Sequence, residues 1–166
     1  MSHRIKNTYC SYCGSQYKEL TWPRHCTECN ELVFKNPIPV AVVLVPVDDK
    51  LLVIRRDIEP ERGKIALPGG YIDYGETWQE GCSRELREET DVVIDPKDIY
   101  HHWVTSSPNG IILIFGITKR QKEYDLPPFK GNRETSERLL IARAEKLAFP
   151  LQTQAVENYF EGIWGM

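Results

Sequence analysis

A glycine-rich loop followed by a helix that carries acidic side chains is the segment that most narrows the folds open to this chain. The loop, residues 68–76, contains three glycines and two acids. Residues 77–90 contain no proline, and Thr77 and Glu80 have the spacing of a capping box, so the sequence predicts a helix over 77–90. Because glycine lets backbone groups approach a ligand closely, the loop suits a metal or a phosphate.

Three carboxylates of this helix, Glu85, Glu88 and Glu89, fall within an arc of about 100° at helical spacing. Like charges so close repel one another by roughly a few tenths of a kcal/mol per pair. One interpretation is a solvated charged face with Arg84 and Arg87 as partners. The other is a cluster of hard oxygen ligands for Mg²⁺ or Mn²⁺. The preceding glycine-rich loop favours the metal site.

Four cysteines near the N-terminus form two C-x-x-C pairs separated by twelve residues, and a fifth, Cys82, stands alone. Four thiolates at this spacing predict a structural zinc ribbon, with reduced core cysteines or a redox role as alternatives. A zinc ion held by four sulfurs has no open position, so the chemistry is expected elsewhere. The odd count fits a reducing compartment. The predicted zinc ligands are Cys10, Cys13, Cys26 and Cys29.

The chain divides into two unequal parts, a zinc ribbon over residues 1–35 and a larger domain over 36–166. The larger part is predicted to be α/β or α+β, with a mixed sheet and two main helices. Strands are predicted at 40–45, 51–54, 65–67, 92–94, 100–106, 111–119 and 138–143, the first two as a hairpin, with a second helix at 152–160 and a loop at 121–133.

The composition excludes several classes of protein. The 166 residues are 41% hydrophobic and 27% charged with a formal net charge of -3, which rules out a disordered chain, a collagen and a coiled coil. A weakly acidic chain has no electrostatic drive to coat nucleic acid or anionic lipid. The longest apolar run, Val40–Val45, is far shorter than the roughly 20 residues that span a bilayer, and no secretory signal is visible. We therefore expect the cytoplasm.

The loop and helix together resemble a known sequence signature. The stretch Gly70-x5-Glu76-x7-Arg84-Glu85-Leu86-x-Glu88-Glu89-x-Asp91-Val92 resembles the Nudix box, G-x5-E-x7-R-E-U-x-E-E-x-G-U, where U is aliphatic. Only Asp91 departs from it, since the family has glycine there. With the cysteine pairs before it and residues 145–149 after it, the chain looks like the zinc-ribbon branch of Nudix hydrolases, which contains NADH and FAD pyrophosphatases. The implied fold is a mixed β-sheet sandwiched between helices.

The resemblance implies a reaction in which water attacks one phosphorus of a pyrophosphate in a nucleoside diphosphate linked to another group. By position, Glu85, Glu88 and Glu89 hold Mg²⁺ or Mn²⁺, and the Gly69 carbonyl is a further candidate ligand. Arg84 and Glu76 are expected to orient these carboxylates. Asp91 can adopt the left-handed backbone that glycine favours at a cost of roughly 1 kcal/mol, so we expect lost stability and not lost activity.

The preferred substrate is less determined. NADH pyrophosphatases of this kind carry an S-Q-P-W-P-F-P-x-S array after the box, which this chain lacks, so FAD or ADP-ribose is expected. The Glu134-x-x-Glu137 pattern is similar to that of FAD-cleaving members. Glu137 is predicted as a general base or a further metal ligand, with a solvated loop carboxylate as the alternative. The predicted substrate-binding residues are Arg56, Gly69, Gly70 and Tyr71.

Two other functions stay open at this point. One is an NADH or other dinucleotide pyrophosphatase, and the other is a nucleotide-sensing regulatory or nucleic-acid-binding protein that uses the ribbon. The complete set of metal carboxylates favours the enzyme, because a pure sensor does not need it. We expect a small-molecule dinucleotide as partner, neither a membrane nor a nucleic acid, and leave a homodimer open.

Overall fold

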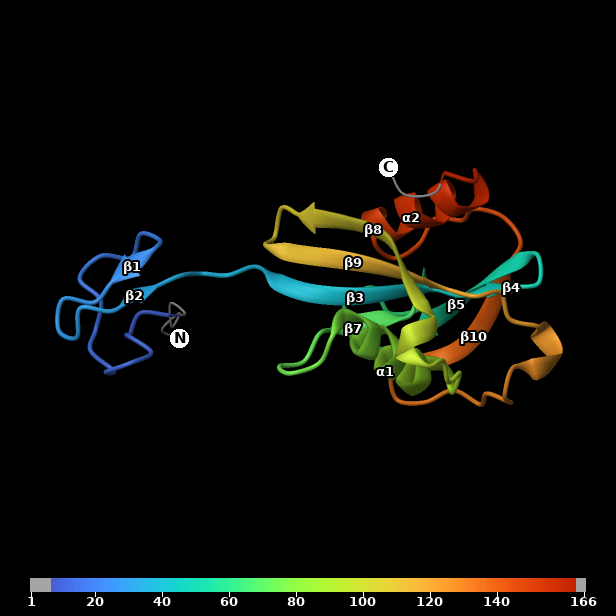
Figure 1. Cartoon of the computed structure of the whole chain (residues 1–166), viewed down its shortest axis with the longest axis horizontal. Helices are drawn as coiled ribbons and strands as arrows, with labels where there is room; N and C mark the ends of the chain where they lie inside the picture. The colour runs from blue at the N-terminus through green and yellow to red at the C-terminus, as the bar shows by residue number, and fades with distance from the viewer. Residues whose placement is uncertain (1–6, 164–166) are drawn as a thin grey trace. The chain divides into compact units, whose positions relative to one another are not determined.

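The computed structural model of the chain describes residues 7–163, and the chain divides into two compact units between Pro37 and Ile38 (Figure 1). The boundary lies two residues beyond the one expected from the sequence. Each unit is described separately below. Among residues 7–163, no helix combines the length and the apolarity needed to cross a membrane.

The N-terminal unit is built from two similar turns. Gly14 and Asn30 both have positive φ angles, 77° and 63°. Their N–H groups donate to the carbonyls of Cys10 and Cys26, both at 2.9 Å. Each turn therefore brings one C-x-x-C pair to a single side of the backbone. The antiparallel strands of this unit are β1 (Arg24–His25) and β2 (Leu32–Val33).

The larger unit contains two sheets, and the expected mixed α+β fold is confirmed. Strands β3 and β9 run parallel, whereas the other pairs are antiparallel. The first sheet has the order β7 (Gly69–Tyr71), β3 (Ile38–Leu44), β9 (Ile111–Thr118) and β8 (Ile99–Ser107). The second has the order β10 (Thr135–Ile141), β5 (Lys50–Arg56) and β4 (Pro46–Val47), with β6 (Ile65–Ala66) also paired to β5.

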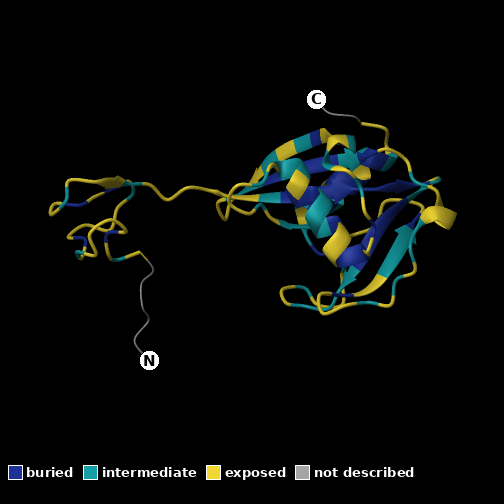
Figure 2. Ribbon diagram, turned by 60° about the horizontal axis from the view of Figure 1, so that its bottom comes forward, coloured by how far each residue is buried: buried dark blue, intermediate teal, exposed yellow. Residues whose placement is uncertain are grey.

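The two helices, α1 (Trp78–Thr90) and α2 (Pro150–Phe160), cover opposite faces of the first sheet (Figure 1). The packing of strand β3 explains why its sequence is an unbroken apolar run. Val42 and Leu44 pack in the cluster that contains α2, while Ala41 and Val43 pack in the cluster that contains α1. Because both faces are covered, no polar side is needed. Figure 2 shows the buried residues concentrated in the strands and helices of the larger unit. Short 3₁₀ turns occur at Pro96–Asp98 and Glu123–Asp125.

The predicted hairpin of residues 40–45 and 51–54 is present only next to its turn, where β4 pairs with β5 and the Leu52 N–H donates to the Val45 carbonyl at 3.0 Å. After Leu44 the chain passes from the first sheet to the second, and it is β4 that pairs with β5. Both runs are wholly apolar, so their pattern does not identify the sheet to which each belongs. Residues 92–94 are also not a strand. The Ile94 carbonyl accepts a hydrogen bond from Ser83 Oγ, which holds this segment against α1.

Candidate active site and cysteine cluster

Helix α1 begins and packs as its sequence predicts. The Thr77 N–H donates to Glu80 Oε2 at 2.7 Å and the Glu80 N–H donates to Thr77 Oγ1 at 3.2 Å, which completes the capping box. Cys82 and Leu86 are fully buried against β3 and its neighbours. The opposite side of the helix therefore presents its charged residues to the loop and to β7.

Arg84 joins the loop to the helix through all five of its N–H groups. Nε and Nη2 donate to the two carboxylate oxygens of Glu76 at 3.1 and 2.6 Å, and Nη2 also donates to the Tyr71 carbonyl at 2.8 Å. Nη1 donates to Glu85 at 2.6 Å and to Glu88 at 3.4 Å. The hydrogen bonds from Arg84 lower the pKa of the Glu76 carboxyl. This guanidinium is saturated, so it orients the carboxylates and has no N–H left for a ligand.

The backbone of β7 lies against two of the three helix glutamates. Glu89, only 4% exposed, accepts a hydrogen bond from the Gly69 N–H at 2.9 Å, and burial raises its pKa to about 8. The Glu85 carboxylate covers Gly70 so closely that a Cβ there would lie 2.3 Å from Oε1. Burial also raises the pKa of Glu85. Two partly desolvated carboxylates on a glycine backbone fit a divalent cation, which would stabilise their charged forms.

Glu88 is the third glutamate of the set and is half exposed. Its carboxylate oxygens lie 3.4 Å from Arg84 Nη1 and 3.9 Å from Arg87 Nη2. The three glutamates share one helix face as predicted. Their carboxylate oxygens do not all lie within 4.8 Å of one another. Among residues 7–163, only the four cysteines place three or more potential ligand atoms within 4.8 Å of one another.

The two acids of the Glu134-x-x-Glu137 pattern have different surroundings. Glu137 lies opposite Arg55 in the β10–β5 pairing and forms an ion pair with it at 2.6 Å. Burial is the largest cause of the raised pKa of Glu85 and of Glu89, and the negative charge of Glu134 lies near enough to add to both shifts. The sequence prediction singled out Glu137, whose catalytic role stays a prediction. The available signal for Glu134 was its place in the loop just before the strand.

The residues predicted to bind substrate surround these carboxylates. The positive charge of Arg56 offsets part of the rise that burial causes in the pKa of Glu89. Arg56 Nε donates to the Pro60 carbonyl at 2.9 Å, and its guanidinium carbon lies 5.2 Å from the ring centre of Phe149. Gly69 and Gly70 contact Glu89 and Glu85 as described above. The Tyr71 residue, next along β7, is 59% exposed.

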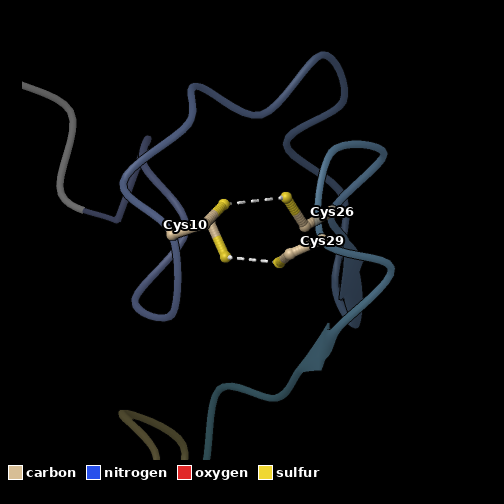
Figure 3. A group of neighbouring side chains, drawn as sticks. Cys10, Cys26 and Cys29 are labelled. Atoms are coloured by element: carbon tan, nitrogen blue, oxygen red, sulfur yellow. Dashed lines mark hydrogen bonds between the residues drawn. The ribbon is translucent and has the colours of Figure 1, made fainter.

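The four predicted zinc ligands form a compact cluster in the N-terminal unit (Figure 3). The sulfurs of Cys10 and Cys29 are 3.7 Å apart, and those of Cys13 and Cys26 are 3.6 Å apart. None of these cysteines forms a disulfide. The Cys13 backbone N–H lowers the pKa of the Cys10 thiol to about 6, whereas burial and the neighbouring sulfurs raise the pKa of Cys29 to about 12, so a cation would be needed to hold both sulfurs as thiolates at neutral pH. The cluster is compatible with zinc.

Comparison with known proteins gives one family match. The NUDIX domain model matches residues 35–152. This range includes α1, the glycine-rich loop and Glu134, and it excludes the four clustered cysteines.

Two relatives cover parts of the chain. An ADP-ribose pyrophosphatase of Methanocaldococcus jannaschii is 35% identical over 77 residues, which are 46% of this chain and 44% of that protein. An NAD-capped RNA hydrolase, NudC, of Shigella flexneri is 30% identical over 102 residues, which are 60% of this chain and 38% of that protein. The matches thus span less than half of each relative.

Solved structures share the fold. The crystal structure of a NUDIX hydrolase from Nitrosomonas europaea superposes with a TM-score of 0.75 at 24% identity, over 93% of this chain and 90% of that one. The NUDIX domain of Shewanella oneidensis NrtR, solved with ADP ribose, gives a TM-score of 0.64 at 22% identity, over 78% of this chain and 90% of that one.

Proposed function

The chain belongs to the Nudix family, since the family model covers 35–152 of its 166 residues, and from this premise we propose that it hydrolyses the pyrophosphate bond of a nucleoside diphosphate linked to another group. ADP-ribose or FAD is the proposed substrate, and a mononucleotide is released. The observation that carries the proposal is the packing of Glu85 and Glu89 on the glycines of β7, with Arg84 holding the loop to the helix.

Glu85, Glu88 and Glu89, with the Gly69 carbonyl, are the proposed ligands of Mg²⁺ or Mn²⁺. Carboxylate and carbonyl oxygens are the donors that these hard cations prefer. When bound, the cation supplies charge neutralisation for the pyrophosphate and acidifies the attacking water. Arg84 keeps the Glu85 carboxylate oriented through its 2.6 Å hydrogen bond, and the Gly69 N–H does the same for Glu89.

We propose Glu134, in place of Glu137, as the general base. In the reaction the water oxygen bonds to phosphorus, the bridging P–O bond breaks, and the proton of the water passes to the base. The Glu134 carboxylate is exposed and influences Glu85 and Glu89, whereas Glu137 is already paired with Arg55. A base must reach the proton that it accepts, so this position favours Glu134. Arg56 is proposed to contact the phosphate oxygens.

The remaining expectations concern the whole chain. The cysteine cluster is proposed as a structural zinc ribbon of residues 1–35, ahead of a Nudix domain of 36–166. Five free cysteines support a reducing compartment such as the cytoplasm. A homodimer stays a prediction. ADP-ribose is supported by the Methanocaldococcus relative, and FAD by the resemblance of the region after the box.

A second candidate substrate is a nicotinamide dinucleotide, either free or joined to the end of an RNA. The NudC relatives favour it. The absence of the S-Q-P-W-P-F-P-x-S array argues against it, because groups outside the box must bind the nicotinamide part.

The test is the kcat/KM for ADP-ribose, FAD, NADH and a nucleoside triphosphate at one Mg²⁺ concentration. We expect ADP-ribose or FAD to be cleaved fastest. Changing Glu88 or Glu89 to Gln should lower kcat by about 10²-fold, the scale for loss of one group that stabilises transition-state charge. Glu157→Gln on the far helix α2 is the matched control and should turn over normally.

Three results would contradict the proposal at different levels. No cleavage of any compound with Mg²⁺ or Mn²⁺ would exclude the hydrolase. Normal turnover of both glutamine variants would exclude the metal assignment. An advantage of more than about tenfold for NADH or the triphosphate, roughly 1.4 kcal/mol of transition-state binding, would replace the substrate.

A further inference from the structure

The C-terminal end of α1 is held by a side chain from a distant loop. Within the helix the Glu88 carbonyl would accept from the N–H four residues later, but the Val92 N–H donates to Thr90 Oγ1 at 3.2 Å. Asn132 supplies the missing donor, and its Nδ2 lies 2.7 Å from the Glu88 carbonyl oxygen. The last turn of the metal-binding helix is thus anchored to the segment before β10.

The other end of the same amide organises the turn that carries Glu134. Asn132 Oδ1 accepts from the N–H groups of Glu134 and Thr135, both at 2.9 Å. The Asn132 N–H donates to the Thr135 carbonyl at 2.8 Å, which closes the turn. Gly131 precedes it with a φ of 81°, and a Cβ there would lie 2.9 Å from the Ser136 carbonyl oxygen. The turn is therefore tightly specified by both backbone and side chain.

The Glu134 backbone is fixed on its other side as well, because its carbonyl accepts from the Asp57 N–H at 2.7 Å. Its carboxylate has no hydrogen bond or ion pair with any of residues 7–163. The backbone is thus held firmly while the carboxylate remains available. The direction in which that carboxylate points relative to Glu85 and Glu89 depends on the turn, and the turn depends on Asn132.

We propose that Asn132 is a positioning residue that fixes Glu134 relative to the metal-binding carboxylates of α1. The inference rests on the proposed function, in which Glu134 is the general base. An amide is required because one side chain must donate to the helix and accept from the turn at once. Aspartate keeps the acceptor and loses the donor, and alanine loses both.

The test is a double-mutant cycle measured with the best substrate of the panel. We expect Asn132→Ala to lower kcat by about tenfold with KM within about twofold, since substrate contacts are untouched. Glu134→Gln should lower kcat by about 10²-fold. If Asn132 acts through Glu134, the double variant should be no slower than Glu134→Gln alone, because the shared effect is counted once. Asn132→Asp keeps the acceptor for the turn but removes the hydrogen bond to the Glu88 carbonyl, so it tests that hydrogen bond separately. We expect it to lower kcat nearly as much as Asn132→Ala does.

Arg138→Met is the matched control for a merely structural role. Arg138 donates to the Thr90 carbonyl at 2.8 Å, so it too anchors the end of α1, but it does not hold the Glu134 turn. Its effect on kcat should multiply with that of Glu134→Gln. The positioning role would be overturned if the effects of Asn132→Ala and Glu134→Gln on kcat also multiplied. Normal turnover of Asn132→Asp would overturn it too, and in both cases the hydrolase would stand. Normal turnover of Glu134→Gln would overturn both the base and its positioning residue, and an inactive natural protein would overturn the proposed function itself.

Discussion

At the scale of single residues, Glu89 combines two demands that conflict without a cation. To serve as the proposed metal ligand it must lie near β7, and that place is almost completely buried. One N–H from Gly69 compensates only part of the lost hydration, because its pKa still rises to about 8 from an ordinary value of 4.5. The carboxylate is therefore suited to bind a cation and poorly suited to remain charged alone.

This conflict predicts an unusual pH dependence of stability in metal-free protein. Between pH 4.5 and about 8 the folded state holds a proton on Glu89 that the unfolded state has released. Its contribution to the free energy of unfolding is complete below pH 4.5 and is lost as the pH rises through 8, with a slope of at most about 1.4 kcal/mol per pH unit. Urea unfolding of the natural protein and of Glu89→Gln at pH 5, 6.5 and 8 measures it.

The glutamine variant should be less sensitive to pH over this range, since it has no proton to lose. Saturating Mg²⁺ should flatten the dependence of the natural protein as well, because the cation replaces the proton. An identical pH dependence of both metal-free proteins would show that Glu89 is not the group responsible.

At the scale of elements, the end of α1 depends on one departure from the family pattern. Asp91 has φ 59° and its N–H donates to the Arg87 carbonyl at 2.9 Å, as glycine would in this position. The sequence prediction that aspartate adopts the left-handed conformation is confirmed. Asp91 also acts through its charge on Arg138, which binds the neighbouring Thr90 carbonyl. Asp91 therefore contributes an attraction to Arg138 as well as the free-energy cost of its left-handed backbone.

We predict that Asp91→Gly raises the free energy of unfolding by about 0.5–1 kcal/mol, since relief of the left-handed strain exceeds the loss of an exposed charge. Asp91→Ala should lower it, because alanine keeps the strain and loses the charge. Urea denaturation of the three proteins should give the order glycine, aspartate, alanine, with hydrolysis unchanged. Equal stability of all three would mean that this helix end is not strained.

Some elements of the fold were predictable from the sequence and others were not. Helix α1, its capping box and the cysteine turns depend on residues close together in the chain, so local patterns identify them. No local pattern identifies the strand that pairs with β3, because two fully apolar strands fit either sheet equally well. Residues 92–94 have the composition of a strand, yet they are used to pack beside α1. The position of Glu134 relative to the helix depends on a turn and on Asn132, which no periodic pattern reveals.

At the scale of the whole molecule, the family match and the cysteine cluster fall in different parts of the chain. The matched region begins at residue 35, after all four clustered cysteines. In the N-terminal unit, Cys10, Cys26 and Tyr17 form the small core. A unit with so few buried apolar residues needs a further source of stability, which a bound zinc ion would supply. We therefore expect zinc to determine folding of this unit without taking part in hydrolysis.

The prediction is tested with Cys26→Ser. Metal analysis should find one zinc per chain in the natural protein and much less in the variant, because a hydroxyl is a far weaker zinc ligand than a thiolate. The amide NMR signals of residues 7–37 should lose their dispersion, while hydrolysis stays within about twofold, since four sulfurs leave zinc no position for a water. Cys82→Ser is the matched control: this thiol is buried in α1, so its loss should keep the zinc and destabilise the larger unit instead. The structural role would be contradicted by natural protein that contains no zinc while all four thiols are free. It would also be contradicted by a variant that loses hydrolysis while residues 38–163 stay folded.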